Sequence, residues 1–170
     1  MSKKENNKII FTGSSGTIVK SIIHDFANLE KFRKFKILCL SSSENNIKTI
    51  STINNFNYSE SQNLDKILNE NSILIHFAAV TRSDRDQSKY KINEKITSSL
   101  VFSSSKNKIK KFIYISSDLA GLSKGPYGLS KEKIEKLIKQ SNINYTILRL
   151  SPFIAKGEFC NNSSIFKLIK

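Results

Sequence analysis

"KIIFTGSSGTI", residues 8–18, contains a short apolar run of strand length, a turn with two glycines and the start of a segment with helical spacing. Gly13 and Gly16 at such a strand-to-helix turn allow a tight bend and let backbone amides approach a pyrophosphate, which the helix N-terminus also favours. Any tight β-α turn can use such glycines, but the position at the first junction favours a phosphate-binding role. Val19 stands where a third glycine would allow close helix–strand contact, so we expect an outward shift of the helix or local repacking.

Apolar runs of strand length alternate with helical segments along the rest of the chain, which is typical of β-α units and a parallel sheet. Repeated right-handed crossovers make a doubly wound sheet the default. The sequence therefore predicts a Rossmann-like α/β three-layer sandwich, as one NAD(P)-binding domain over residues 1–170, with ligands beyond the carboxyl ends of the strands. We expect strands at 8–13, 34–41, within 47–56, and at 72–80, 110–117 and 144–151, and helices after Gly16 and at 61–71, 86–105 and 127–141. In helix 86–105 the residues expected on one side are Tyr90, Ile92, Ile96 and Leu100.

The composition fits a globular cytoplasmic protein, with 38% hydrophobic and 25% charged residues. No run approaches the roughly 18 apolar residues that a membrane helix needs. The start, "MSKKENNKII", lacks the apolar stretch of a signal peptide. Cys39 and Cys160 form no metal-like cluster. We therefore expect no membrane partner and no metal.

A net charge of +14 raises the question of nucleic acid. The basic residues are nearly all Lys, however, and they are scattered along the chain. No run joins basic residues to stacking aromatics, as in single-strand binders. The charge therefore favours an anionic small molecule over a nucleic-acid partner.

"GPYGLSKEKIEKLI", residues 125–138, places Tyr127 and Lys131 four residues apart. Residues at this spacing are neighbours on one helix face. A Tyr that packs its ring beside an extended Lys gives the same pattern as a phenol and an amine that handle protons together. The pair alone does not decide between these readings.

Six motifs occur in the order found in a known family. The motifs are "TGSSGTI" at 12–18, "HFAAV" at 76–80, Asn93, "YISS" at 114–117, "YGLSK" at 127–131 and "LRLSPFI" at 148–154. By these motifs the chain resembles the extended short-chain dehydrogenase/reductase superfamily, and specifically the NAD-dependent epimerase/dehydratase family, over residues 8 to about 155.

The resemblance implies a catalytic role for the Tyr127–Lys131 pair. Tyr127 would be the acid/base, and Lys131 would lower its pKa while bonding the nicotinamide ribose. A free phenol with a pKa near 10 is protonated at neutral pH, and a neighbouring ammonium favours the phenolate. Ser117, in preference to Ser116, would bond the reacting oxygen. His76 is expected to pack within the sheet.

The resemblance also implies a dinucleotide cofactor, NAD or NADP, with its pyrophosphate over Gly13–Gly16. An acidic residue that grips the ribose of NAD commonly follows the second strand, but here Ser41, Ser42 and Ser43 stand there. The sequence therefore does not decide between NAD and NADP, and we take NAD as the first candidate. Arg82 and Arg85 fit either a phosphate contact or a solvated loop, and Arg149 and Pro152 match a pattern that leads toward the substrate. The residues expected to contact the cofactor are Gly13, Ser15, Gly16, Thr17, Ile18, Ser41, Phe77, Ala78, Ala79, Asn93, Tyr127 and Lys131.

The family's chemistry implies oxidation and reduction at a hydroxyl of a nucleotide sugar, by an epimerase, dehydratase or reductase. Its members pair as homodimers through the helices expected at 86–105 and 127–141. The alternative is a non-catalytic dinucleotide-binding protein, a sensor or partner subunit, with a relic site. The joint presence of Ser117, Tyr127 and Lys131 argues against a relic.

Family members usually run well past the position of Lys170, and their C-terminal segment binds the sugar nucleotide. The C-terminal substrate lobe is therefore expected to be largely absent. A truncated form of a longer enzyme, a compact enzyme and a cofactor-binding relic all fit this length. We expect measurable dinucleotide binding and poor sugar-nucleotide turnover unless a partner subunit covers the cleft.

Overall fold

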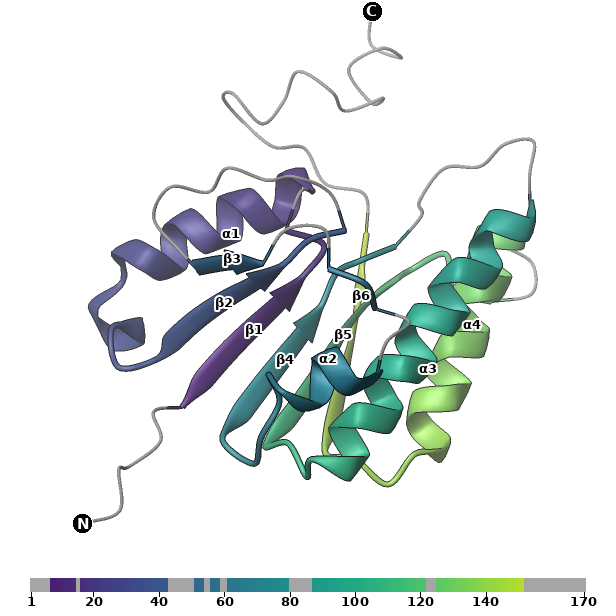
Figure 1. Cartoon of the computed structure of the whole chain (residues 1–170). Coiled ribbons are helices and arrows are strands. Elements are labelled where there is room, and N and C mark those ends of the chain that lie inside the picture. The colour runs from purple at the N-terminus through teal and green to yellow at the C-terminus, as the bar shows by residue number, and fades with distance from the viewer. Residues whose placement is uncertain are drawn as a thin grey trace, which may run out of the picture.

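Six parallel strands form one sheet in the computed structural model, which describes residues 7–14, 16–42, 51–53, 56–58, 61–79, 87–121 and 125–151 (Figure 1). The strand order is β3-β2-β1-β4-β5-β6. From β1 the chain adds strands toward one edge of the sheet, as far as β3, and then returns to add β4, β5 and β6 on the other side of β1. Doubly wound folds bind ligands in the crevice at the carboxyl ends of the two strands where this order reverses, here β1 and β4. The strands are β1 (Lys8–Thr12), β2 (Lys36–Leu40), β3 (Ser51–Ile53), β4 (Ser72–His76), β5 (Lys111–Ser117) and β6 (Tyr145–Leu150).

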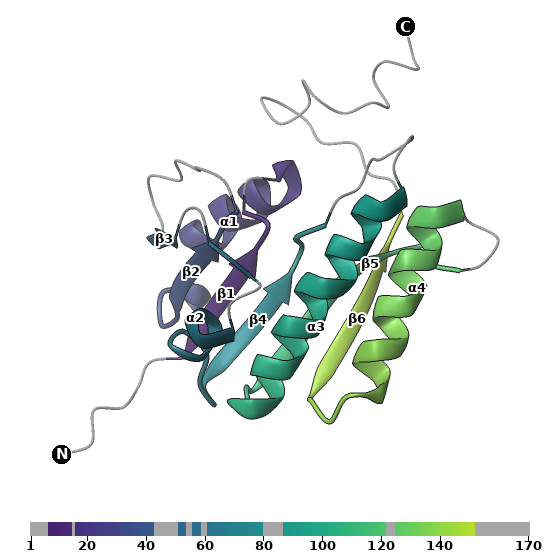
Figure 2. The same cartoon turned by 45° about the vertical axis from the view of Figure 1, so that its right-hand side comes forward.

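Helices cover both faces of this sheet, with α1 on one face and α3 and α4 on the other (Figures 1 and 2). The helices are α1 (Thr17–Asn28), α2 (Ser61–Asp65), α3 (Tyr90–Lys106) and α4 (Gly125–Gln140), with short 3-10 turns at Glu30–Phe32 and Gln87–Lys89. The short helix α2 contacts α3 on the second face. The sequence-based prediction of a doubly wound, three-layer α/β fold is confirmed.

Two hydrophobic layers follow from the alternation of side chains along each strand. Ile10 of β1 packs with residues of α3 and α4, whereas Phe11 faces α1. Val19, which takes the place of a third glycine in the turn motif, is buried beside Phe11 and Ile23. The Val19 side chain is thus accommodated in the hydrophobic layer between α1 and the sheet.

Helix α3 differs in one respect from the sequence-based expectation. Ile92 was predicted on the inner side with Tyr90 and Leu100, but it is 48% exposed. The positions that face the sheet include the polar residues Asn93 and Thr97. The prediction was wrong because it assumed that the apolar positions of this helix mark its buried side.

The β5–β6 half of the sheet is covered by helices on one face only, within the part of the chain that the structure describes. On the face that α1 shares, Leu148 and Leu150 of β6 are 44% and 37% exposed.

Among the described helices, none combines the length and the apolar character that crossing a membrane would need.

Candidate active site

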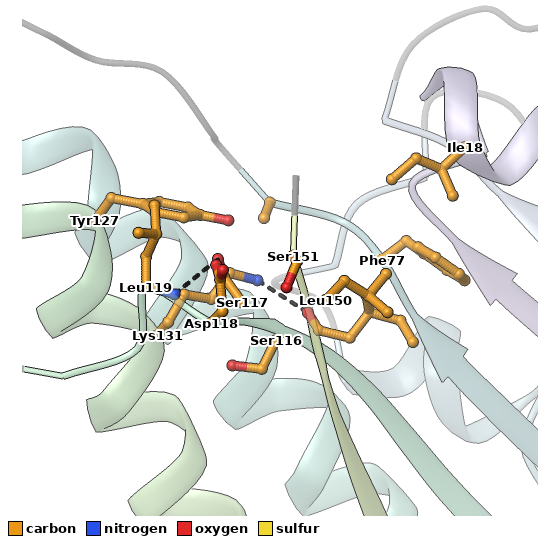
Figure 3. A pocket seen from close by; sticks show the side chains of 12 residues that line it. Ile18, Phe77, Ser116, Ser117, Asp118, Leu119, Tyr127, Lys131, Leu150 and Ser151 are labelled. Carbon is orange, nitrogen blue, oxygen red and sulfur yellow. Dashed lines mark hydrogen bonds between the residues drawn. The ribbon is translucent and has the colours of Figure 1, made fainter. Parts of the chain in front are cut away.

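Ser117, Tyr127 and Lys131 line one cavity of about 210 Å³ at the carboxyl ends of the strands (Figure 3). Ser117 is the last residue of β5, and Tyr127 and Lys131 lie one turn apart on α4. The cavity also contacts Ile18 in the first turn of α1 and Phe77 after β4. Leu150 and Ser151 at the end of β6 complete the lining. Residues from five separate segments, including both sides of the point where the strand order reverses, therefore meet at the place expected for a ligand.

The ammonium group of Lys131 is held below the ring of Tyr127. Its Nζ donates to the carbonyl oxygen of Ile115 at 3.0 Å and lies 4.7 Å from the centre of the Tyr114 ring. The same atom is 5.8 Å from the centre of the Tyr127 ring. Burial lowers the pKa of Lys131 to about 8, although the charge of Glu135 acts in the opposite direction. A buried amine with this pKa can lose its proton in mildly alkaline solution.

The phenol of Tyr127 lies at the mouth of the same cavity (Figure 3). Burial, with smaller contributions from Tyr90 and Asp118, raises its pKa above the ordinary value, and a hydrogen bond with Ser117 offsets part of the rise. The lowering of this pKa by Lys131 that the sequence analysis expected is not seen here. Burial outweighs the distant ammonium, so the structure holds Tyr127 as a protonated acid.

Ser116 and Ser117 both contact the cavity but use their hydroxyls differently. The Ser116 Oγ donates to Oε1 of Glu135 at 2.7 Å and is thereby committed to the protein interior. The Ser117 Oγ accepts from the Leu119 amide at 3.2 Å and makes a long, 3.3 Å bond to Asp118. The weaker bonds of Ser117 leave its hydroxyl the easier of the two to redirect toward a ligand.

Glu135 is a buried carboxylate that the sequence analysis missed. Arg149 grips it through Nε at 2.8 Å and Nη2 at 2.7 Å, and Lys139 lies 3.7 Å away. Burial alone would raise the pKa of Glu135, but the bonds from Arg149 and Ser116 outweigh burial and hold the pKa below its ordinary value. Arg149, which the sequence analysis associated with the path to the substrate, therefore directs its guanidinium to α4.

The turn between β1 and α1 has the features of a phosphate cradle. Gly13 has a φ of +75°, and a Cβ on it would lie 2.7 Å from the Ala78 nitrogen. The Gly16 amide donates to the Gly13 carbonyl at 2.9 Å, and Gly16 caps α1 without a side-chain hydrogen bond. Gly16 has no side chain that could accept from the first amides of α1, and the first turn has no acidic residue. This arrangement fits an anionic group such as a pyrophosphate.

The other predicted cofactor residues divide into two groups. Ile18, Phe77 and Ala79 line the cavity, and Ala78 forms the backbone contact with Gly13. Ser41 and Asn93 are buried and do not line it. The positions outside the described residues are Ser15, Ser43, the Thr17 side chain, Arg82, Arg85 and Pro152.

His76 is buried at the end of β4, and burial lowers its pKa from 6.5 to about 3, with a smaller effect from Lys131. The unfolded chain takes up a proton below pH 6.5, whereas the folded protein does not until about pH 3. We therefore predict that the titration of His76 lowers the free energy of unfolding by about 1.4 kcal/mol for each pH unit as the pH falls through this window. Above the window His76 should have no effect on the pH dependence. Urea unfolding at several pH values measures the slope.

The control for this prediction is His76→Asn, which removes the titrating group and should flatten the acid limb of the curve. The difference between the two proteins isolates His76 from carboxylates such as Glu135, which also favour unfolding in acid. His24→Asn changes the exposed histidine and should leave the limb unchanged. Identical acid limbs for the protein and His76→Asn would contradict the assignment.

Comparison with known proteins connects this geometry to a family. The model of the 3-beta hydroxysteroid dehydrogenase/isomerase family matches residues 10–122. No curated protein matches the chain significantly. Three solved structures illustrate the similarity in fold, all at low sequence identity.

UDP-N-acetylglucosamine 4-epimerase from Bacillus cereus has a TM-score of 0.74 and 21% identity, with 93% of this chain and 57% of that chain covered. UDP-glucuronic acid 4-epimerase from Bacillus cereus, in complex with NAD, has a TM-score of 0.73, 19% identity and coverage of 89% and 58%. WbmH from Bordetella bronchiseptica, in complex with NAD+, has a TM-score of 0.72, 15% identity and coverage of 88% and 57%. The chain thus spans less than three fifths of the length of these proteins.

Proposed function

The chain belongs to the 3-beta hydroxysteroid dehydrogenase/isomerase family, within the extended short-chain dehydrogenases/reductases, and on this premise we propose that it catalyses NAD(P)-dependent redox chemistry at a hydroxyl of a nucleotide sugar. The observation that carries the proposal is the meeting of Ser117, Tyr127 and Lys131 in one cavity beside the glycine turn. A core-packing role for Tyr127 and Lys131 would not require a serine hydroxyl in the cavity that they line, nor a glycine turn that leads into Ile18 of the same lining.

The residues present fit a nicotinamide dinucleotide. The positive φ of Gly13 and the uncapped start of α1 suit a pyrophosphate. Ile18 and Ala79 supply apolar and small surfaces for the nicotinamide ring in the cavity. Lys131 would hold the ribose. When bound, the nicotinamide would accept a hydride from the carbon that carries the substrate hydroxyl.

The roles of the chain's own groups follow from their protonation. Tyr127 would take the proton of the substrate hydroxyl through its Oη, which requires the phenolate. Burial opposes that form, so a positive charge near the phenol must offset the rise in the Tyr127 pKa. Lys131 can supply part of this charge if it turns from the Ile115 carbonyl toward the ribose. Ser117 would donate a hydrogen bond to the reacting oxygen.

Single-turnover reduction of the cofactor tests this proposal. The protein would be mixed with NAD+ or NADP+ and each of several UDP-sugars. The reduced nicotinamide would be followed by absorbance and the sugar by NMR. The proposal expects reduced cofactor or a changed sugar for at least one substrate. Tight cofactor binding with no reaction across the panel would favour the alternative, a non-catalytic dinucleotide-binding subunit.

A homodimer through α3 and α4 belongs to the same proposal. Phe102 of α3 is 64% exposed and borders a shallow groove between the two helices, and Ile92 on the same helix is also exposed. A charged residue at the centre of an apolar interface is costly because it must be desolvated. We predict that Phe102→Glu converts a dimer to a monomer, as measured by light scattering after size exclusion.

The matched control is Leu29→Glu, which places the same charge at an exposed leucine outside α3 and α4. It should leave the mass unchanged. A monomeric wild-type protein at high concentration, or a Phe102→Glu variant that remains dimeric, would refute the proposed interface.

A further inference from the structure

A continuous line of hydrogen bonds crosses the core beside the glycine turn. His76 Nδ1 lies 2.6 Å from Oγ1 of Thr12, and its Nε2 lies 2.9 Å from Oγ1 of Thr97. The strand register produces the first contact, because Thr12 of β1 pairs with His76 of β4. All three side chains are buried, so water does not compete for these bonds.

The direction of each bond follows from the end of the line at α3. Thr97 Oγ1 donates to the Asn93 carbonyl oxygen at 2.8 Å. A threonine hydroxyl has one proton, so Thr97 must accept from His76, and Nε2 carries the imidazole proton. The buried imidazole is neutral, which leaves Nδ1 bare, and Thr12 must donate to it.

The other end of the line reaches the cofactor turn. With its proton committed to His76, Thr12 Oγ1 presents lone pairs and accepts the Ala78 amide at 3.3 Å. This is the amide against which Gly13 packs without a Cβ. Thr12 immediately precedes Gly13 in the chain, and Ala79 beyond Ala78 lines the cavity. The hydrogen-bond line therefore ends where the phosphate cradle meets the segment after β4.

We propose that His76 is a positioning residue, fixed as the Nε2–H tautomer, which orients the Thr12 hydroxyl and thereby holds the Ala78 backbone against the glycine turn. The proposal rests on the proposed function only in naming NAD(P) as the ligand of that turn. His76 does not line the cavity. Its influence on cofactor affinity passes through Thr12 and Ala78.

Two amide substitutions distinguish the hydrogen bond made by Nδ1 of the imidazole from the one made by Nε2. In His76→Asn the side-chain oxygen can occupy the place of Nδ1 and accept from Thr12, while the donor to Thr97 is lost. In His76→Gln the side-chain amide can occupy the place of Nε2 and donate to Thr97, while the acceptor for Thr12 is lost. Each variant loses one buried hydrogen bond, so a purely structural role predicts similar effects from both.

The first test needs no ligand and no substitution in the hydrogen-bond line; its only variant changes the exposed His24. The ¹⁵N shifts of the two histidines distinguish the tautomers, and a His24→Gln sample assigns the signal of His76. We expect the Nε2–H form and slow hydrogen exchange at the Ala78 amide. A dominant Nδ1–H form would overturn the proposal, because Thr12 would then accept from the imidazole.

The second test compares the variants by titration with NAD+ and NADP+. We expect His76→Gln to weaken cofactor binding about tenfold and to speed exchange at Ala78, and His76→Asn to stay within about threefold of wild type in both. Equal losses in the two variants would overturn the positioning role. A wild-type protein that binds neither cofactor would defeat the proposed function instead, and the tautomer and the Ala78 exchange would still decide the role of His76.

Discussion

Replacing Tyr127 with Phe is expected to lower kcat about a thousandfold while changing cofactor affinity less than threefold. The substitution removes only the hydroxyl that would transfer the proton, and general acid–base groups commonly contribute factors of about 10² to 10⁴. The ring remains to fill its place against Tyr90, 5.9 Å away between ring centres. Steady-state kinetics with the substrate found by single turnover measures kcat, and calorimetric titration measures the cofactor Kd.

Tyr145→Phe is the matched control for this experiment. Tyr145 begins β6 and packs against the core layer of α3 and α4, away from the cavity. Loss of its hydroxyl should leave kcat within twofold of wild type. A Tyr127→Phe variant that retains more than a tenth of wild-type kcat would remove Tyr127 from the acid/base role, even if Ser117 and Lys131 proved essential.

Gly13→Ala is expected to have the largest effect on folding and to abolish dinucleotide binding. The new Cβ would lie 2.7 Å from the Ala78 nitrogen and 2.8 Å from its Cα, which are backbone atoms that cannot rotate away. Its φ of +75° also strains any residue with a Cβ. Left-handed strain and overpacking together should cost about 3 to 5 kcal/mol of unfolding free energy. Urea unfolding measures this loss.

Gly125→Ala separates the two causes of that loss. Gly125 has a φ of +76°, nearly the value of Gly13, but a Cβ on it would meet no atom within 4 Å. Only backbone strain should appear, at about 1 to 2 kcal/mol. If Gly13→Ala and Gly125→Ala lose the same unfolding free energy, then the close approach of Gly13 to Ala78 is not the reason why the turn needs a glycine.

The sequence was sufficient for the fold because its signals were local. Every strand except β3 contains an apolar run, and the Gly13–Gly16 turn marks the start of helix α1. The weak segment before Phe56 did yield a short strand, β3. The order of strands in the sheet has no such local signal and was not predicted; the preference for right-handed crossovers predicted only that the sheet is doubly wound.

The site was only partly predictable because several of its contacts join distant residues of unexpected polarity. Ser117, Tyr127 and Lys131 were named from their motifs, and the structure brings them to one cavity. Glu135 looks like a surface charge in the sequence, and only the packing of α4 on β6 buries it and brings it to Arg149, whose own side chain remains 49% exposed.

The line through His76 was missed for a related reason. Its partners Thr12 and Thr97 are 64 and 21 residues away, and the helix that carries Thr97 turns polar residues toward the sheet. Periodicity of apolar residues cannot reveal a buried polar face. The polar residues Asn93 and Thr97 on the buried side of α3 are explained only by the histidine that lies opposite them.

The central claim is that a nicotinamide dinucleotide binds across the strand ends with its pyrophosphate at the turn from Gly13 to Gly16. Calorimetric titration of the full chain with NAD+ and NADP+, with backbone amide shifts recorded in parallel, tests it most directly. We predict saturable binding of at least one cofactor below millimolar concentration, with the largest shifts at Gly13, Gly16 and Ala78. Absence of saturable binding below millimolar concentration for both cofactors, or binding that leaves those three amides unshifted, would contradict the claim.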